Sequence, residues 1–208
     1  MEEVLDVYQR PYNPKRPVVC FDERPKQLIG ETRNPIRVMP GRLERYDYEY
    51  KRNGVANLFM MFEPLVSKRQ VKVTQRRTKK ELADCWQELV DKIYPEAEKI
   101  VLVLDHLNTH KKASLYEVFE PAEAKRIADK LEIHYTPKHG SWLNMAEIDL
   151  SVLSRQCLAE RMENIIRLEK EVMAWTTKQN ARRTKVNWQF TTEDARIRLK
   201  KLYPSIEA

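Results

Sequence analysis

The sequence contains little of what marks several common protein classes. Its three cysteines, Cys20, Cys85 and Cys157, are far apart and form no CxxC pair, so neither a disulfide framework nor a zinc–thiolate site is favoured. With four glycines and no GxGxxG or GxxxxGK motif, nucleotide-cradling loops are not indicated. No apolar run approaches the ~20 residues that span a bilayer, and the acidic N-terminus lacks a signal-peptide pattern. We therefore expect a reduced, cytoplasmic setting.

Basic residues, in contrast, are abundant and grouped. The net charge is +7, and one cluster, "SKRQVKVTQRRTKK", contains no acid, while a second covers the C-terminal part of the chain. Such clusters attract polyanions through counterion release and long-range steering, although charge runs also occur as solvated surface. We favour nucleic acid as the partner. The candidate contact residues in these clusters are Arg76, Arg77, Arg182, Arg183 and Lys185.

Two apolar segments run directly into an aspartate. Residues 100–104, "IVLVL", do not alternate with polar residues, which is typical of a central strand covered on both faces, and Asp105 follows. "PVVCFD" similarly ends in Asp22. An acid at the end of such a strand lies where the sheet opens into a crevice, a common ligand site. The alternative is that Asp105 only begins a turn.

The remaining pattern predicts strands and helices in alternation. The turn signal Asn53–Gly54 predicts a hairpin within residues 46–62. Further expected elements are a strand near 70–73, a helix over 79–93, helical structure within 113–130, a strand at 131–135, helices near 144–160 and 162–176, and a short helix capped by Thr191 or Thr192. Three antiparallel strands followed by alternating strands and helices predict a mixed α/β sheet in one domain.

A third acid lies in "TPKHGSWLNMAEIDLSVLSRQ". Asn144 is placed to cap a helix, and Glu147 lies in its first turn beside the apolar stripe. Glu147 either contributes to a site with the strand-end acids or only supports the N-cap. In the preceding loop, Lys138 and His139 are further candidates for nucleic-acid contact. Trp142 either stacks on a base or packs under the helix.

Four segments together resemble one family: "CFDERPKQL", "LVLDHLNTH", "TPKHGSWLNMAEIDLSVLSRQCL" and "NWQFTTEDARIRLKKLYP". They resemble bacterial insertion-sequence transposases related to mariner, whose catalytic part is a DDE superfamily endonuclease domain with a ribonuclease-H-like fold. The resemblance implies that Asp22, Asp105 and Glu147 are the catalytic acids and hold two Mg²⁺ ions, with Mn²⁺ as a substitute. It further implies DNA cleavage and strand transfer at element ends by phosphoryl transfer.

The chain departs from the family pattern at two places. His106 stands where Asn commonly follows the second acid, and only Met1–Lys15 precede the first strand, where helix-turn-helix segments are usual. We therefore expect a catalytic fragment, a truncated copy, or one product of a split reading frame whose partner half reads DNA. His106 and His110 lack the accompanying motifs of a zinc site, and His110 is expected to hydrogen-bond within its loop.

These inferences predict three segments: a linker remnant at 1–15, a ribonuclease-H-like catalytic domain at 16–177, and a basic C-terminal segment at 178–208. Trp188 and Phe190 are expected to anchor the last segment on the core. The expected partners are the element ends, target DNA and a second copy of the chain, in a homodimer or higher assembly. Two alternatives are a catalytically impaired DNA-binding or oligomerisation remnant, and a metal nuclease that cuts without strand transfer.

Overall fold

A five-stranded mixed sheet forms the centre of the computed structural model, which describes residues 1–33, 36, 38–43, 45, 47–138, 140–184 and 186–203. The strands are β1 (Val18–Glu31), β2 (Tyr50–Glu63), β3 (Lys68–Thr74), β4 (Ile100–Leu104) and β5 (Leu131–Tyr135). Their order is β3-β2-β1-β4-β5, with antiparallel pairing among β1 to β3 and parallel pairing of β4 with β1 and β5. The predicted mixed sheet is confirmed.

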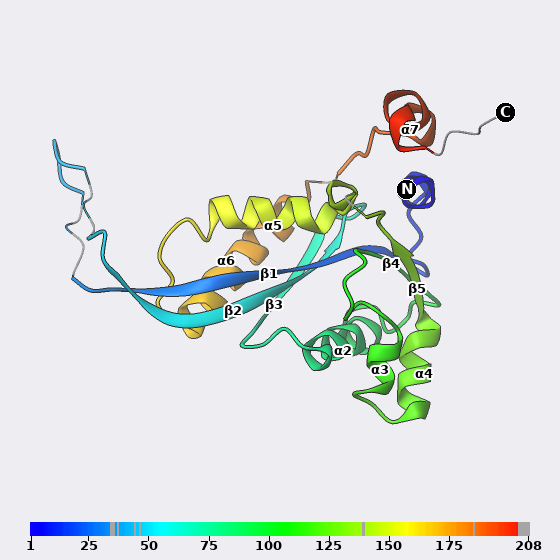
Figure 1. Ribbon diagram of the computed structural model, residues 1–208, viewed down its shortest axis with the longest axis horizontal. Helices are drawn as coiled ribbons and strands as arrows, with labels where there is room; N and C mark the ends of the chain where they lie inside the picture. The colour runs from blue at the N-terminus through cyan, green and yellow to red at the C-terminus, as the bar shows by residue number, and fades with distance from the viewer. Residues whose placement is uncertain are drawn as a thin grey trace.

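Helices cover both faces of this sheet (Figure 1). They are α1 (Glu2–Gln9), α2 (Lys79–Glu88), the π-helical turn η1 (Leu89–Ile93), α3 (Ala113–Tyr116), α4 (Pro121–Lys130), the 3₁₀ turn η2 (Ser141–Leu143), α5 (Met145–Gln156), α6 (Ile165–Arg182), α7 (Thr192–Arg198) and the 3₁₀ turn η3 (Lys200–Leu202). One core lies between the sheet and α1, α5 and α6, and the other between the sheet and α2, α3 and α4.

The side chains of β1 alternate between these two cores. Val18 and Cys20 belong to the core beneath α5, whereas Val19 and Phe21 belong to the core above α2. This is the period of two that a strand imposes. Continued by one step, the alternation places Asp22 on the α5 face and Glu23 on the α2 face.

The predicted hairpin turn at Asn53–Gly54 is wrong. Both residues lie inside β2, where Val55 pairs with Gln27 and Arg52 with Ile29 across a local register shift, and Gly54 has a positive φ of 102°. The chain instead reverses near Gly41, whose φ is 76°, between the paired Met39 and Arg42. The chain thus turns at Gly41, and the pairing of β2 with the long strand β1 accommodates Gly54 as an irregularity within the strand.

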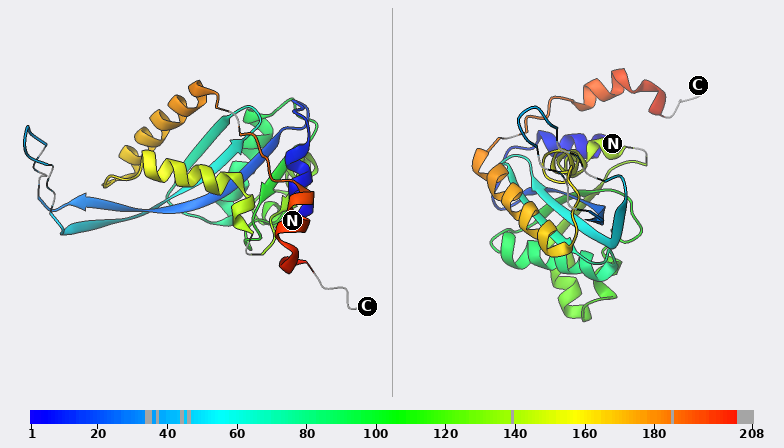
Figure 2. Two further views of the ribbon diagram at one scale, coloured as in Figure 1. Left: turned by 90° about the horizontal axis from the view of Figure 1, so that it is seen from above. Right: turned by 90° about the vertical axis from the view of Figure 1, so that its left-hand side faces the viewer.

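The ribbon of β1 and β2 consequently extends well beyond the helices (Figures 1 and 2). The sequence pattern had ended the first strand near Asp22, but β1 continues to Glu31. Tyr46, which belonged to the predicted hairpin, lies outside the described residues. The helices predicted near 144–160 and 162–176 are present with shifted ends.

Residues 1–15 are only partly exposed as a linker would be, because residues 11–15 are exposed and several residues before them are buried. They include α1, and the side chains of Val4, Leu5 and Val7 are fully buried in the core beneath α5. The apolar spacing Val4, Leu5, Tyr8 gives this short helix a face that must be covered. The boundaries of the three predicted segments stay a prediction.

The C-terminal segment returns to α1. Thr191 caps α7, and Ala195 is fully buried. Arg196 pairs with Glu2 of α1 at 2.8 Å. Within the described residues, no helix is long and apolar enough to cross a membrane.

Candidate active site

Asp22, inside β1, and Asp105, directly after β4, lie side by side because the two strands run in parallel. The register pairs Cys20 of β1 with Val103 of β4, and each aspartate stands two residues further along. Adjacent strands are about 4.8 Å apart, so residues at equivalent positions are neighbours. The register therefore brings together two of the acids expected from the sequence.

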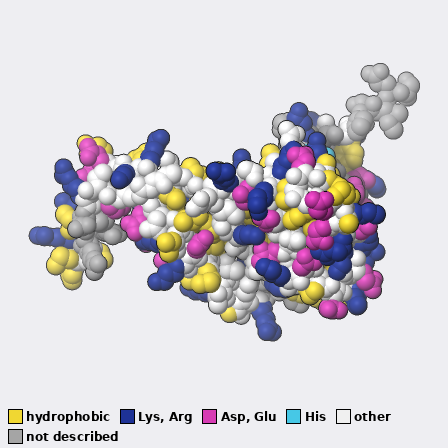
Figure 3. Space-filling model, turned by 90° about the horizontal axis from the view of Figure 1, so that it is seen from below, with side chains coloured by type: hydrophobic (Ala, Val, Ile, Leu, Met, Phe, Trp, Pro, Cys, Tyr) yellow, Lys and Arg dark blue, Asp and Glu magenta, His cyan; other side chains and the backbone are white. Residues whose placement is uncertain are grey.

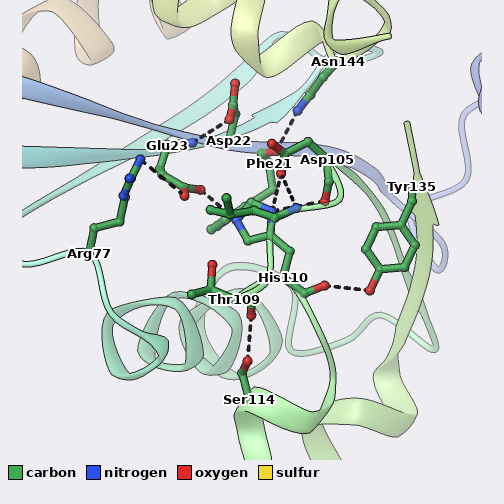
Figure 4. Close-up of polar contacts among 11 residues, drawn as sticks. Phe21, Asp22, Glu23, Arg77, Asp105, Thr109, His110, Ser114, Tyr135 and Asn144 are labelled. Atoms are coloured by element: carbon green, nitrogen blue, oxygen red, sulfur yellow. Dashed lines mark hydrogen bonds and ion pairs between the residues drawn. The ribbon is translucent and has the colours of Figure 1, made fainter. Parts of the chain in front are cut away.

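Asn144 places the N-terminus of α5 beside these acids. Its side-chain oxygen accepts a hydrogen bond from the Ala146 N–H at 3.1 Å, which confirms the predicted N-cap. Its side-chain amide donates to the carbonyl of Phe21 at 2.8 Å, directly before Asp22 (Figure 4). One buried side chain thus caps the helix that carries Glu147 and fixes it to β1.

The charges of the other two acids act on Asp22. Burial, with smaller contributions from the carboxylates of Asp105, Glu23 and Glu147, raises the pKa of Asp22 to about 7, although a hydrogen bond from the Glu23 backbone N–H opposes the rise. Like charges disfavour ionisation when they lie within a few ångströms. Without a cation, the site therefore carries more negative charge than its surroundings compensate.

The side chain of Glu147 does not take part in capping α5. The Asn144 backbone N–H, which a capping carboxylate would bind, donates instead to the Ser141 carbonyl at 2.7 Å. The Oε2 atom of Glu147 is buried and has no hydrogen-bond partner in the part of the chain that the structure describes. A buried carboxylate oxygen without a donor is unfavourable, so the cap does not explain why an acid stands there.

Asp105 is partly engaged by a neighbouring histidine. Its Oδ1 lies 2.6 Å from His110 Nδ1, a contact that lowers the pKa of Asp105. Among the described residues, no group of three or more His, Cys, Asp or Glu side chains is arranged to hold a metal ion. The side chains of Asp22, Asp105 and Glu147 therefore do not stand in ligating positions.

The donor set nevertheless suits a hard divalent cation. Mg²⁺ and Mn²⁺ prefer oxygen ligands, which the three carboxylates supply. The partnerless Oε2 of Glu147 and the raised pKa of Asp22 are what a site lacking positive charge would show. The residues present thus fit such an ion.

The contact between Glu23 and His110 was not predicted from the sequence. The expectation that His110 bonds within its loop is confirmed, but its Nε2 also lies 2.7 Å from Glu23 Oε2. Burial alone would lower the pKa of His110, and the hydrogen bonds to Asp105 and Glu23 raise it to about 9. An acid on the buried α2 face of β1 requires a partner, which is the signal that could have revealed this contact.

The predicted nucleic-acid contacts are only partly brought together. Arg76, Lys138, Arg182 and Arg183 are exposed, and Arg77 lies 3.9 Å from Glu23, next to the acids. His139 and Lys185 lie outside the described residues.

The first basic cluster is not a uniform basic surface. Lys72, Lys79 and Lys80 each pair with an acid, and Arg69 is buried against Asp149. Figure 3 shows Lys and Arg side chains interspersed with Asp and Glu on the face that it draws.

The sequence model of the DDE superfamily endonuclease family matches residues 17–169, and the chain belongs to this family. The match spans Asp22, Asp105 and α5. A search of curated protein sequences found no significant match.

Solved structures support the same fold. The Mos1 mariner paired-end complex with Mn is similar with a TM-score of 0.56 at 14% identity, covering 87% of this chain and 55% of that one. The Mos1 strand transfer complex is similar with a TM-score of 0.57 at 14% identity, covering 85% and 51%. The chain thus spans about half the length of these proteins. At such identity the likeness establishes the fold, and the predicted ribonuclease-H-like class is confirmed.

Proposed function

We propose that this chain is the catalytic domain of a DNA transposase that cleaves and joins DNA strands at the ends of a mobile element. Asp22, Asp105 and Glu147 are the catalytic acids. The observation that carries the proposal is the register of β1 with β4, together with the Asn144 contact that fixes α5 beside them. Family membership supports the endonuclease chemistry.

The three acids would hold two Mg²⁺ ions, or Mn²⁺ in their place. Bound ions would lower the pKa of a water or 3′-hydroxyl nucleophile and stabilise the leaving oxygen. The charges of both other acids act on Asp22, so Asp22 would be the ligand that the two ions share. Glu147 would contribute a buried oxygen that has no hydrogen-bond partner among the described residues, and Asn144 holds its helix in place. No residue of the chain needs to become covalently attached to DNA.

DNA and a second copy of the chain are the proposed partners. Solved complexes of similar fold are described as paired-end and strand transfer complexes. Between β1 and β2, the side chains of Leu43 and Tyr48 are 84% and 86% exposed, with Ile36, Val38 and Met39 also exposed nearby. Exposed apolar groups at the end of a projecting ribbon favour contact with another protein surface. Sedimentation of the Leu43→Asp variant with and without DNA tests the homodimer.

A plasmid-nicking assay tests the proposed chemistry. Supercoiled plasmid carrying the element ends would be incubated with the protein and Mg²⁺, Mn²⁺ or EDTA. We expect metal-dependent nicking that Asp22→Asn, Asp105→Asn and Glu147→Gln each abolish, while the exposed Asp129→Asn control cleaves normally. Nicking that survives all three substitutions in folded protein would remove the assignment.

A DNA-binding remnant without turnover is the second candidate. One observation favours it: His106, which stands where the family commonly has Asn, stacks on Tyr135 at 4.4 Å between ring centroids instead of offering an amide. Such a remnant would bind DNA but would neither nick it nor respond to Mn²⁺. His106→Asn distinguishes the two, because it should raise the nicking rate only of a weakly active enzyme.

A further inference from the structure

A buried histidine lies between two carboxylates directly behind the proposed site (Figure 4). His110 is fully buried, with Nδ1 at 2.6 Å from Asp105 Oδ1 and Nε2 at 2.7 Å from Glu23 Oε2. Glu23 is itself only 3% exposed, whereas Asp105 is 41% exposed. The ring thus connects a fixed interior acid to a partly exposed one.

Both ring nitrogens of His110 face carboxylate oxygens. A neutral imidazole carries one N–H, so satisfying both oxygens requires the doubly protonated ring, which donates from each nitrogen. Nδ1 also lies 3.3 Å from the backbone carbonyl oxygen of Asp105, so oxygen atoms hold the ring at both of its nitrogens.

Other contacts hold the segment that carries the ring. The Tyr135 hydroxyl of β5 donates to the His110 carbonyl at 2.6 Å. The Ser114 hydroxyl donates to the Thr109 carbonyl at 2.7 Å, and the Phe21 ring meets the imidazole edge-on at 5.7 Å. The backbone and side chain of His110 are therefore both fixed to neighbouring elements.

We propose that His110 and Glu23 are positioning residues for Asp105; the inference rests on the proposed function. The ring holds Oδ1 of Asp105, and the Leu107 N–H also donates to it at 3.3 Å. Among the described residues, no hydrogen bond reaches the other oxygen, Oδ2. These contacts restrain the orientation of the Asp105 carboxylate and leave Oδ2 available to a cation.

Two consecutive residues of β1 therefore have different roles. Asp22 faces α5 and joins the acids directly, while Glu23 faces α2 and acts on Asp105 through His110. The position of the second acid therefore depends on the strand that carries the first. Residues that orient a metal ligand in this way typically change metal affinity tenfold to a hundredfold when they are replaced.

The chain contains a matched control for this bridge. His134 of β5 also lies between two carboxylates, with Nδ1 at 2.7 Å from Glu3 and Nε2 at 3.0 Å from Glu132. Its side chain is 8% exposed, and these partners are not among the three proposed catalytic acids. Loss of His134 should therefore reproduce the stability effect of losing such a bridge without the effect on the metal.

The test is a Mn²⁺ titration followed by thermal unfolding, which requires no catalysis, alongside nicking kinetics. In His110→Ala and Glu23→Gln, we expect the Mn²⁺ concentration for half-maximal stabilisation and for half-maximal nicking to rise about tenfold to a hundredfold. His110→Asn, which keeps a donor near Asp105, should recover part of this loss. His134→Ala should lower the unfolding temperature and leave the Mn²⁺ requirement unchanged.

Two outcomes would overturn the inference, and they differ from failure of the proposed function. If the His110 and Glu23 variants unfold earlier but titrate with Mn²⁺ as His134→Ala does, the bridge is only structural. If Asp22→Asn responds to Mn²⁺ as the wild type does, the proposed metal site is wrong and the inference falls with it. If Asp22→Asn loses the response while the His110 and Glu23 variants keep it, the positioning role alone is overturned.

Discussion

Two acids on α5, two residues apart, have opposite surroundings. Asp149 is 6% exposed, and its two carboxylate oxygens accept hydrogen bonds from Arg69 Nε at 2.7 Å and 3.0 Å. Glu147 has a buried oxygen without any partner in the described part of the chain. The fold thus pairs the buried carboxylate of Asp149 and leaves one oxygen of the half-buried Glu147 without a partner among the described residues. Such an exception is expected where a ligand completes the site, because an unpaired buried charge is otherwise destabilising.

The contacts of Arg69 explain why Asp149 has a structural role. Its guanidinium also donates to the carbonyl and hydroxyl of Ser67 and lies 4.5 Å from the centre of the Phe62 ring. Burial raises the pKa of Asp149, and the hydrogen bonds and charge of Arg69 oppose that rise. Both oxygens of Asp149 are therefore bonded within the fold, which makes this acid structural.

Replacing the unpaired acid should have the largest effect. We expect Glu147→Gln to lower the nicking rate at least about a thousandfold, equivalent to ~4 kcal/mol, because a carboxylate ligand is lost. Metal-free stability should stay equal or rise, since an uncompensated charge is removed. Asp149→Asn should instead lower stability. Urea unfolding in EDTA measures both, and a destabilised Glu147→Gln would contradict the comparison.

Asp22 should make the metal-free protein sensitive to pH. Its folded pKa of about 7 lies above the ordinary value of 3.8, so the folded state favours the protonated carboxyl. The contribution of Asp22 to the free energy of unfolding is therefore greatest below pH 3.8. It falls by up to about 4 kcal/mol as the pH rises through 7. Asp22→Asn should remove that part of the slope in urea titrations with EDTA at pH 5 and pH 8. Equal slopes in both proteins would refute the raised pKa.

Removing the partner of the paired acid should destabilise the fold. We expect Arg69→Met to lower the free energy of unfolding by about 3 kcal/mol, because Asp149 would remain buried and charged. The double variant Arg69→Met with Asp149→Leu should recover much of this loss, since no charge is left without a partner. A double variant less stable than Arg69→Met would show that the pair stabilises the fold beyond charge compensation.

The cap of α5 should affect both stability and chemistry. Asn144→Ala should reduce stability by about 1–2 kcal/mol through the lost cap and the lost bond to Phe21, and should slow nicking by displacing Glu147. Asn164→Ala is the matched control, because Asn164 caps α6 by accepting from Arg167 N–H at 2.8 Å. That control should lose about 1 kcal/mol and cleave normally. Equal nicking rates in both variants would contradict the positioning of Glu147 by Asn144.

The smallest effect on stability should come from exposed arginines, in contrast to the buried Arg69. Neutralising Arg182 and Arg183 together to Gln should weaken DNA binding and flatten its dependence on salt by up to about two phosphate contacts. Thermal stability should scarcely change, because exposed charges contribute little. The pair Arg196→Gln and Arg198→Gln is the control, since both side chains lie beside acids. An unchanged salt slope would remove Arg182 and Arg183 from the DNA surface.

The sequence by itself determined the features that short stretches encode. The apolar run before Asp105 predicted a buried strand and Asn144 predicted a helix cap. The start of α7 was predicted at Thr191 or Thr192, and Thr191 is the cap. Each depends on neighbours within a few positions, where backbone geometry and hydrogen-bonding groups leave few alternatives. The turn at Asn53–Gly54 failed because strand pairing over all of β1 outweighed a local signal.

Only the tertiary structure decided which buried acids have partners. Glu23 meets His110 across 87 positions, and Arg69 meets Asp149 across 80. Local pattern carries no information on contacts at such separation, because the sheet order and the packing of α5 bring the groups together. For the same reason, the sequence placed Glu147 on a helix beside two strand-end acids, but could not show that its oxygen would be buried without a partner.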